Sequence, residues 1–171
     1  MLTPSELWTW QYCPSKDRLL LNLDNDTQFV TELTGAVLNE KVSSKAFSIA
    51  EAETFWRLHD VLQTVVLDEN ERFDCCLHAL ANRFRQLTAH KSWYFVTQRM
   101  QDIGAYQLVH LQGKDNLLAV VVASDLECIE CLLLASGESL AGKTLTRRTI
   151  IRVLRNRAQL VEQDINLAQS A

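Results

Sequence analysis

One stretch of the chain has the residue types and spacing of a phosphate-binding loop. Residues 137–144 read Gly-Glu-Ser-Leu-Ala-Gly-Lys-Thr and match the pattern G-x-x-x-x-G-K-[ST] at every fixed position. In such a loop, backbone N–H groups surround the phosphates of a nucleotide, the lysine (Lys143) reaches the outer phosphates and the hydroxyl (Thr144) holds Mg²⁺. A P-loop-like nucleotide-binding protein is therefore the alternative function to be weighed.

Three features of the surrounding sequence oppose a nucleotide site. Only 27 residues follow Thr144 in a chain of 171, too few for the βα units that complete such a fold. The apolar run that ends in an acidic residue, 117–125, precedes the motif, whereas a Walker B strand usually follows it. The strands predicted before the motif are antiparallel, but a P-loop is built on parallel βαβ units.

Cysteine and histidine spacings do not predict a metal site or a catalytic site. Cys128 and Cys131 have C-x-x-C spacing, but positions three apart on a strand point to opposite faces. Cys75 and Cys76 are adjacent on a predicted helix, where they point about 100° apart. None of the histidines has a ligand spacing; they are His59, His78, His90 and His110. We expect structural thiols, no metal, no cofactor and no enzymatic activity.

Five arginines gather near the end of the chain: Arg147, Arg148, Arg152, Arg155 and Arg157. We predict a final helix over residues 147–161, on which the arginines at 148, 152 and 155 share one face. Such a face could contact nucleic acid, but the chain is acidic overall and has no recognised nucleic-acid motif. An acidic protein surface is the partner that this pattern favours.

The first half of the chain predicts three strands. Residues 7–12 alternate with period 2, and strands over 18–23 and 27–33 follow. Turn residues at 14–17 make the first two strands a hairpin. The run Leu19-Leu20-Leu21 places a leucine on each face of its strand. Either a helix covers the second face, or that face is an apolar contact surface.

Two helices follow these strands. Ser48 and Glu51 have the spacing of a capping box that opens a helix ending near residue 66. Asp68 begins a second helix in a similar way. Its apolar stripe has spacings of 4, 3, 4 and 3 and consists of Phe73, Leu77, Leu80, Phe84 and Leu87.

The second half of the chain is rich in strands, predicted over 93–98, 106–111, 117–123 and 128–135 with a turn at 113–116. Consecutive strands without helices between them favour an antiparallel sheet. The predicted class is therefore α+β. It has an N-terminal α/β domain (1–88), a C-terminal twisted antiparallel β-barrel-like domain with a final helix (89–165), and a frayed tail (166–171).

Composition limits the class of protein further. The formal net charge of −4 is uneven, with −7 over residues 1–82 and +3 over 83–171. No uncharged apolar stretch of about 18 residues occurs, so we expect no membrane span. The first residues lack the pattern of a signal peptide, and five cysteines, an odd number, fit a reducing cytosol.

Short stretches along nearly the whole chain match one known family. They are Trp8-Thr9-Trp10 with Tyr12, Asp17-Arg18, Leu21-Asn22-Leu23, Ala46-Phe47-Ser48, residues 91–96 (Lys-Ser-Trp-Tyr-Phe-Val), residues 116–121 (Asn-Leu-Leu-Ala-Val-Val), Ala141-Gly142 and Asn156-Arg157. Their order and spacing resemble the cell division protein ZapC family of gamma-proteobacteria. The resemblance implies a cytoplasmic, non-enzymatic protein at midcell that needs no cofactor. Such proteins bind the acidic, tubulin-like GTPase FtsZ and bundle its protofilaments laterally, which stabilises the Z ring.

The resemblance also implies binding residues. It places Leu21 at an apolar pocket of the N-terminal domain, and Lys91 and Arg157 at a pocket of the C-terminal domain whose apolar centre is ringed by basic residues. At a third basic position this chain has Gln86 with Arg85 beside it, so whether Arg85 substitutes stays open. Trp93, two residues after Lys91, is a further candidate contact, with core packing as its alternative.

Bundling requires two contacts for each binding protein. Two pockets on a monomer or one pocket on a weak dimer would both supply them. The sequence does not distinguish between these arrangements.

Overall fold

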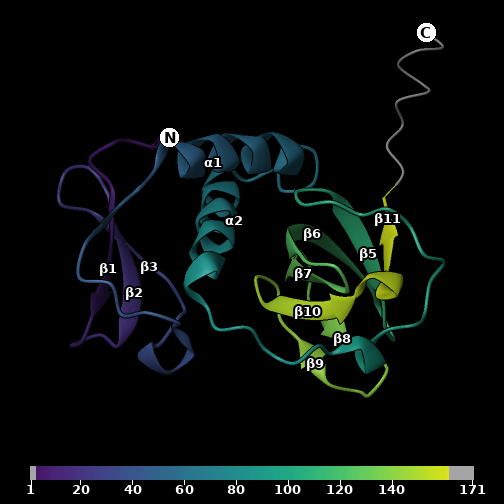
Figure 1. The fold of residues 1–171 in the computed structure, drawn as a ribbon. Coiled ribbons are helices and arrows are strands. Elements are labelled where there is room, and N and C mark those ends of the chain that lie inside the picture. The colour runs from purple at the N-terminus through teal and green to yellow at the C-terminus, as the bar shows by residue number, and fades with distance from the viewer. Residues whose placement is uncertain (1–2, 162–171) are drawn as a thin grey trace, which may run out of the picture. The chain divides into compact units, whose positions relative to one another are not determined.

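The computed structural model describes residues 3–161 (Figure 1). The chain divides into two compact units, Met1–Thr88 and Ala89–Ala171, and each is described by itself. The frayed tail predicted at 166–171 and the end of the predicted second domain, 162–165, lie outside the described residues.

The first unit contains a four-stranded antiparallel sheet. Its strands are β1 (Thr9–Cys13), β2 (Arg18–Asn22), β3 (Gln28–Val30) and β4 (Lys45–Ala46), in the order β3-β2-β1-β4. The hairpin predicted for the first two strands is confirmed, with Trp10 opposite Leu21. The third strand is present but shorter than predicted, and a 3₁₀ turn, η1 (Gly35–Val37), follows it.

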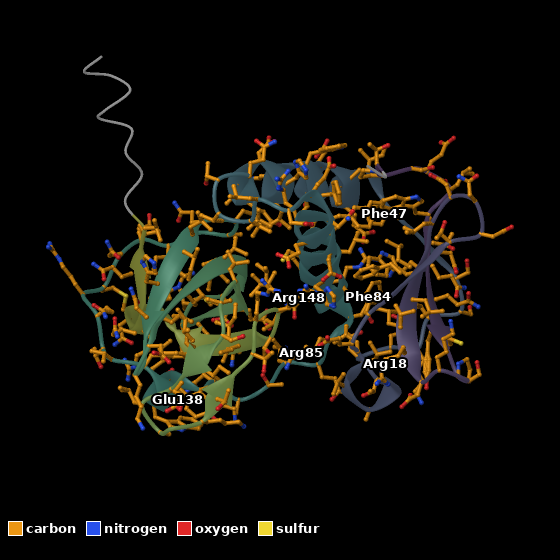
Figure 2. All side chains as sticks on the ribbon, turned by 180° about the vertical axis from the view of Figure 1, so that it is seen from behind. Arg18, Phe47, Phe84, Arg85, Glu138 and Arg148 are labelled. Carbon is orange, nitrogen blue, oxygen red and sulfur yellow. The ribbon has the colours of Figure 1, made fainter. Side chains whose placement is uncertain are left out.

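Aromatic side chains from the sheet and the helices form the core of this unit. Trp8 and Trp10, two positions apart on one face, are both fully buried. The ring of Trp8 lies 5.2 Å from that of Phe47, and the ring of Trp10 lies 5.3 Å from that of Phe84. Figure 2 labels Phe47 and Phe84 between the strands and helix α2 (Glu69–Ala81). The period-2 alternation of the first strand therefore sets which face carries the core.

The run Leu19-Leu20-Leu21 is buried on both faces of β2, with exposed fractions of 0, 2 and 0%. Leu19 and Leu21 lie on the face that carries Trp10, which contacts helix α1 (Ile49–Leu62) through Glu51. Leu20, on the other face, is also covered. The interpretation of this run as an exposed contact surface is wrong.

The two predicted helices are confirmed, and they lie on the same side of the sheet (Figure 1). Ser48 and Glu51 form the predicted capping box of α1 in both directions. Asp68 caps α2 by accepting the backbone N–H of Glu71. Helix α2 is shorter than its predicted stripe: it ends at Ala81 and continues as a 3₁₀ turn, η2 (Asn82–Phe84). Leu87 lies beyond both and is 72% exposed.

The second unit contains a five-stranded antiparallel sheet in the order β10-β7-β6-β5-β11. The strands are β5 (Leu108–Gln112), β6 (Asn116–Ser124), β7 (Cys128–Leu133), β10 (Ile150–Leu154) and β11 (Ala158–Leu160). A separate small hairpin pairs β8 (Gly137–Glu138) with β9 (Thr144–Leu145). The predicted α+β class and antiparallel sheet are confirmed, but the sheet is open and does not close into a barrel.

The predicted final helix over 147–161 is wrong. This segment forms β10, a 3₁₀ turn, η4 (Arg155–Arg157), and β11. In β10 the buried side chains are Ile151 and Val153, which alternate with more exposed neighbours. Such β-branched residues pack well on a pleated surface, and pairing with β7 outweighs the apolar spacing of four that suggested a helix.

The strand predicted over 93–98 is also wrong, because a 3₁₀ turn, η3 (Ser92–Tyr94), occupies its start. The backbone N–H groups of Tyr94 and Phe95 donate to the carbonyls of Lys91 and Ser92 at 3.0 and 3.1 Å. A strand would place Trp93 and Phe95 on one face. The turn instead buries Phe95 and leaves Trp93 exposed.

Glu51 links the sheet, α1 and η2, and its loss tests this packing. Its buried carboxylate accepts from Trp10 Nε1 at 2.7 Å and from Ser48 N at 3.0 Å. It also lies 3.3 Å from the guanidinium of Arg83. Because Glu51→Ala leaves buried donors without an acceptor, we expect it to lower the free energy of unfolding by roughly 2–4 kcal/mol. Urea unfolding followed by tryptophan fluorescence measures this change.

The matched control is Glu53→Ala, which removes an exposed carboxylate from the same helix. We expect it to change the free energy of unfolding by about 0.5 kcal/mol or less. Equal effects of the two substitutions would contradict a special role for Glu51.

Candidate functional site

The structure brings Lys91, Trp93 and Arg157 together in the second unit, and we call these three residues the cation–aromatic surface. The ammonium nitrogen of Lys91 lies 5.3 Å from the centre of the Trp93 ring, within the range of a cation–π contact. The Nε of Arg157 donates to the carbonyl of Ser92 at 3.0 Å. Residues from distant parts of the sequence therefore meet at one turn: Lys91 lies over the Trp93 ring, and Arg157 bonds to the carbonyl of Ser92 between them.

Ser92 fixes this arrangement to the sheet. Its side chain is buried, and its hydroxyl oxygen accepts the backbone N–H of Leu154 at 2.8 Å. The same hydroxyl lies 2.8 Å from Nδ1 of His90. The backbone N–H of Lys91 donates to the carbonyl of Arg152 at 2.7 Å. The end of β10 therefore positions the turn that presents Lys91 and Trp93.

Exposure separates contact residues from core residues in this turn. Trp93 is 56% exposed, whereas Tyr94 and Phe95 are 8% and 2% exposed and belong to the core of the second unit. Core packing therefore accounts for Phe95 but not for Trp93. An exposed indole with a lysine over its ring and an arginine bonded to the same turn has the composition of a protein-binding hot spot, in which aromatic residues and arginine are enriched.

Leu140 is a neighbouring residue that sequence reasoning missed. Its backbone N–H donates to the carbonyl of Tyr94 at 2.9 Å, and it is 45% exposed. Leu140 lies within residues 137–144, the stretch that matches the nucleotide motif. The motif indicated Lys143 and Thr144 as functional residues of this stretch, but not Leu140. Its contribution is apolar area beside η3.

The 137–144 stretch does not have the geometry of a phosphate-binding loop. It forms the β8–β9 hairpin, and no α-helix follows it within the described residues. Most of its backbone N–H groups already donate to protein acceptors. Those of Ser139 and Lys143 bond within the loop, that of Glu138 donates to Asp115 Oδ2, and that of Leu140 donates to Tyr94. These amides cannot surround a phosphate, so the structure removes the basis of the nucleotide alternative.

Leu21 and Arg85 belong to the first unit, whereas the three residues of the cation–aromatic surface belong to the second. Leu21 is fully buried in β2 of the first unit, paired with Trp10 and Phe29. It can influence a partner only through the packing around it. Arg85 belongs to the first unit, where its backbone forms an isolated antiparallel β-bridge with that of Leu38. The side-chain amide of Gln86, the next residue, donates to the carbonyl of Leu38 at 2.8 Å.

The two cysteines of the C-x-x-C stretch are buried and lie on opposite faces of β7, as the spacing predicted. Cys131 belongs to the core cluster together with Ile129 and Leu133, whereas Cys128 lies on the other face of β7. Burial raises the pKa of both thiols, and it raises the pKa of Cys76 to about 12, which disfavours reactive thiolates. Within residues 3–161, no three His, Cys, Asp or Glu side chains are grouped to hold a metal ion.

Two of the clustered arginines hold the β6–β7 turn. Arg152 Nη2 donates to Asp125 Oδ2 at 2.7 Å. Arg155 donates to the carbonyls of Asp125 and Ile103. The turn is further closed by Asp125 Oδ1, which accepts the N–H groups of Glu127 and Cys128. These two arginines are therefore structural, and the nucleic-acid interpretation loses the helical basic face on which it depended.

Fold and site together define a two-unit α+β protein whose exposed aromatic ring and half-buried cations suit the binding of another protein. No helix in the described part of the chain is long and apolar enough to cross a membrane. The chain belongs to the ZapC family of cell-division proteins. The family description "Cell-division protein ZapC, N-terminal" matches residues 1–88, about half of the chain.

Curated relatives extend the match over nearly the whole chain. "Cell division protein ZapC" of Musicola paradisiaca is 26% identical over 99% of this chain and 95% of its own length. The protein of the same name in Vibrio vulnificus is 29% identical over 92% of this chain and 91% of its own. That of Pseudoalteromonas translucida is 28% identical over 97% and 98%. This membership supports a role in cell division.

The Asp125–Arg152 pair predicts an acid-sensitive contribution to stability. The hydrogen bond from Arg152 and those from the backbone N–H groups lower the pKa of Asp125 to about 2. Because the pKa is lower than that of an unfolded aspartate, about 3.9, the stabilisation is present above pH 4 and is lost as the pH falls towards 2. We expect Asp125→Asn to have a lower melting temperature than the wild type at pH 6.

The asparagine keeps an oxygen that can accept from Glu127 and Cys128 but has no charge to pair with Arg152. The gap in melting temperature between wild type and variant should therefore narrow as the pH falls from 4 to 2. A gap that stays constant over this range would contradict the assignment.

Proposed function

We propose that this protein is a non-enzymatic adaptor that binds FtsZ in the cytoplasm at midcell and promotes lateral bundling of FtsZ protofilaments. Family membership supports a role in cell division. The particular partner and the bundling activity follow from the family resemblance. The observation that carries the proposal is the assembly of the exposed Trp93 with the half-buried Lys91 and Arg157 at one turn of the second unit.

The physical argument rests on how such a surface recognises a protein. Trp93 offers a large apolar area at low cost in conformational entropy, because its neighbours Tyr94 and Phe95 fix the turn in the core. Lys91 and Arg157 would steer and orient an acidic partner. Since the whole chain carries a net charge of −4, these local cations give orientation without general attraction to anions.

Bundling needs a second contact, and the proposal allows two sources for it. A monomer could use a further surface on the first unit, or a weak dimer could present the cation–aromatic surface twice.

Leu21 and Arg85 stay predictions. Because Leu21 is buried, a substitution there would test the packing of the first unit before it tested binding.

Lys91→Asp tests the cation–aromatic surface directly. The substitution reverses one charge and removes the cation from the Trp93 ring, so we expect the affinity for FtsZ to fall roughly tenfold or more. Sedimentation of FtsZ with GTP, using FtsZ from the same organism, measures both co-pelleting of this protein and the amount of FtsZ in the pellet. Circular dichroism checks that the variant is folded.

Lys16→Asp is the matched control, since Lys16 is an exposed lysine of the first unit. It makes the same change in net charge and should leave co-pelleting unchanged. Equal losses in the two variants would show that net charge decides binding. Wild-type affinity in a folded Lys91→Asp variant would refute the surface, and no co-pelleting of the wild type would refute the function.

Trp93→Ala separates a contact residue from a core residue. Because the side chain is 56% exposed, its removal should change the free energy of unfolding by about 1 kcal/mol or less while weakening FtsZ binding roughly tenfold or more. Phe95→Ala is the comparison: its side chain is 2% exposed, so we expect a loss of roughly 3–5 kcal/mol in stability. The opposite ranking of stabilities would contradict the described turn.

A further inference from the structure

The first unit contains a pocket that the proposed function does not use. It has a volume of about 360 Å³ and is lined by Asn39, Glu40, Lys45, Arg83 and Phe84. The lining is mostly polar and includes two cations. It therefore differs from the apolar pocket that the family resemblance implied for this unit, and the buried Leu21 does not line it.

Both cations lie over one aromatic ring. The guanidinium carbon of Arg83 is 4.5 Å from the centre of the Phe84 ring, and the ammonium nitrogen of Lys45 is 5.9 Å from it. The ring is only 3% exposed, and it contacts the buried ring of Trp10. The base of the pocket is thus part of the core, which holds the cations in place (Figure 2 labels Phe84).

Backbone pairing fixes the walls of the pocket. The N–H of Asn39 donates to the carbonyl of Phe84 at 2.8 Å, and the side-chain amide of Asn39 donates to the carbonyl of Arg83 at 2.9 Å. Lys45 lies on β4, the last strand in the order of the sheet, where it pairs with Trp10. The pocket is therefore preorganised and open along an edge strand.

Of the two cations that line the pocket, only Arg83 has a carboxylate partner among the described residues. The charge of Arg83 is partly balanced by Glu51, 3.3 Å away, which also accepts from Trp10 and Ser48. Lys45 has no carboxylate within ion-pair distance among the residues that the structure describes. The pocket thus presents one available ammonium group, a second cation beside it, and Glu40 at its wall as an acceptor.

We propose that this pocket binds a carboxylate side chain of an acidic peptide segment from a partner protein. The carboxylate lies between Lys45 and Arg83, and Glu40 accepts a backbone N–H of the same segment. Charge-assisted hydrogen bonds to Lys and Arg are stronger than neutral ones, and the aromatic base excludes water beneath them. The site goes beyond the proposed function, since it needs neither FtsZ nor the cation–aromatic surface.

The test uses the full chain and a fluorescent hexaglutamate peptide, with hexaglutamine as the uncharged probe, in an anisotropy titration at low salt. Wild type should bind hexaglutamate and not hexaglutamine. Lys45→Gln should weaken binding by about twofold to fivefold, as expected for an exposed charge pair. Glu40→Gln should strengthen binding, because it removes a like charge and keeps an oxygen acceptor.

Lys16→Gln is the control, because it removes an exposed lysine of the same unit away from the pocket lining. It should bind hexaglutamate as the wild type does. Circular dichroism confirms that each variant is folded. Lack of binding by the wild type, wild-type affinity in Lys45→Gln, or an equal loss in Lys16→Gln would each overturn the proposal.

Discussion

The cation–aromatic surface depends on the hydrogen bonds of one buried serine. Ser92 accepts the N–H of Leu154 with its hydroxyl and the Nε of Arg157 with its carbonyl. These bonds attach the 3₁₀ turn to the end of β10, so that Trp93 is exposed beside Lys91 while the two following aromatics enter the core. Without them, the lysine, the indole and the arginine would have no fixed geometry.

The first unit positions its cations by a related device. Glu51 joins the capping box of α1 to Trp10 and to Arg83, and Arg83 covers the ring of Phe84. In both units a buried polar group therefore orders an aromatic residue and a cation next to each other. A polar group of this kind specifies one arrangement because every alternative would leave buried donors without partners.

Local signals in the sequence predicted much of the fold. The capping box at Ser48, the hairpin turns and the α+β class followed from residue chemistry within a few positions. The final helix failed because Ile150–Leu154 fits a helical spacing as well as a strand, and only pairing with β7 decides between them. The P-loop pattern failed for the same reason: its amides bond to Asp115 and Tyr94, which are remote in sequence.

The site itself was only partly predictable. The resemblance indicated Lys91 and Arg157, but the exposure of Trp93 and the burial of Leu21 depend on tertiary packing.

Site-specific photo-crosslinking from position 93, in dividing cells, tests most directly the central claim that the cation–aromatic surface contacts FtsZ. The account predicts a crosslink to FtsZ from position 93 and none from exposed Leu67. No crosslink from position 93, or one to a different protein alone, would contradict it.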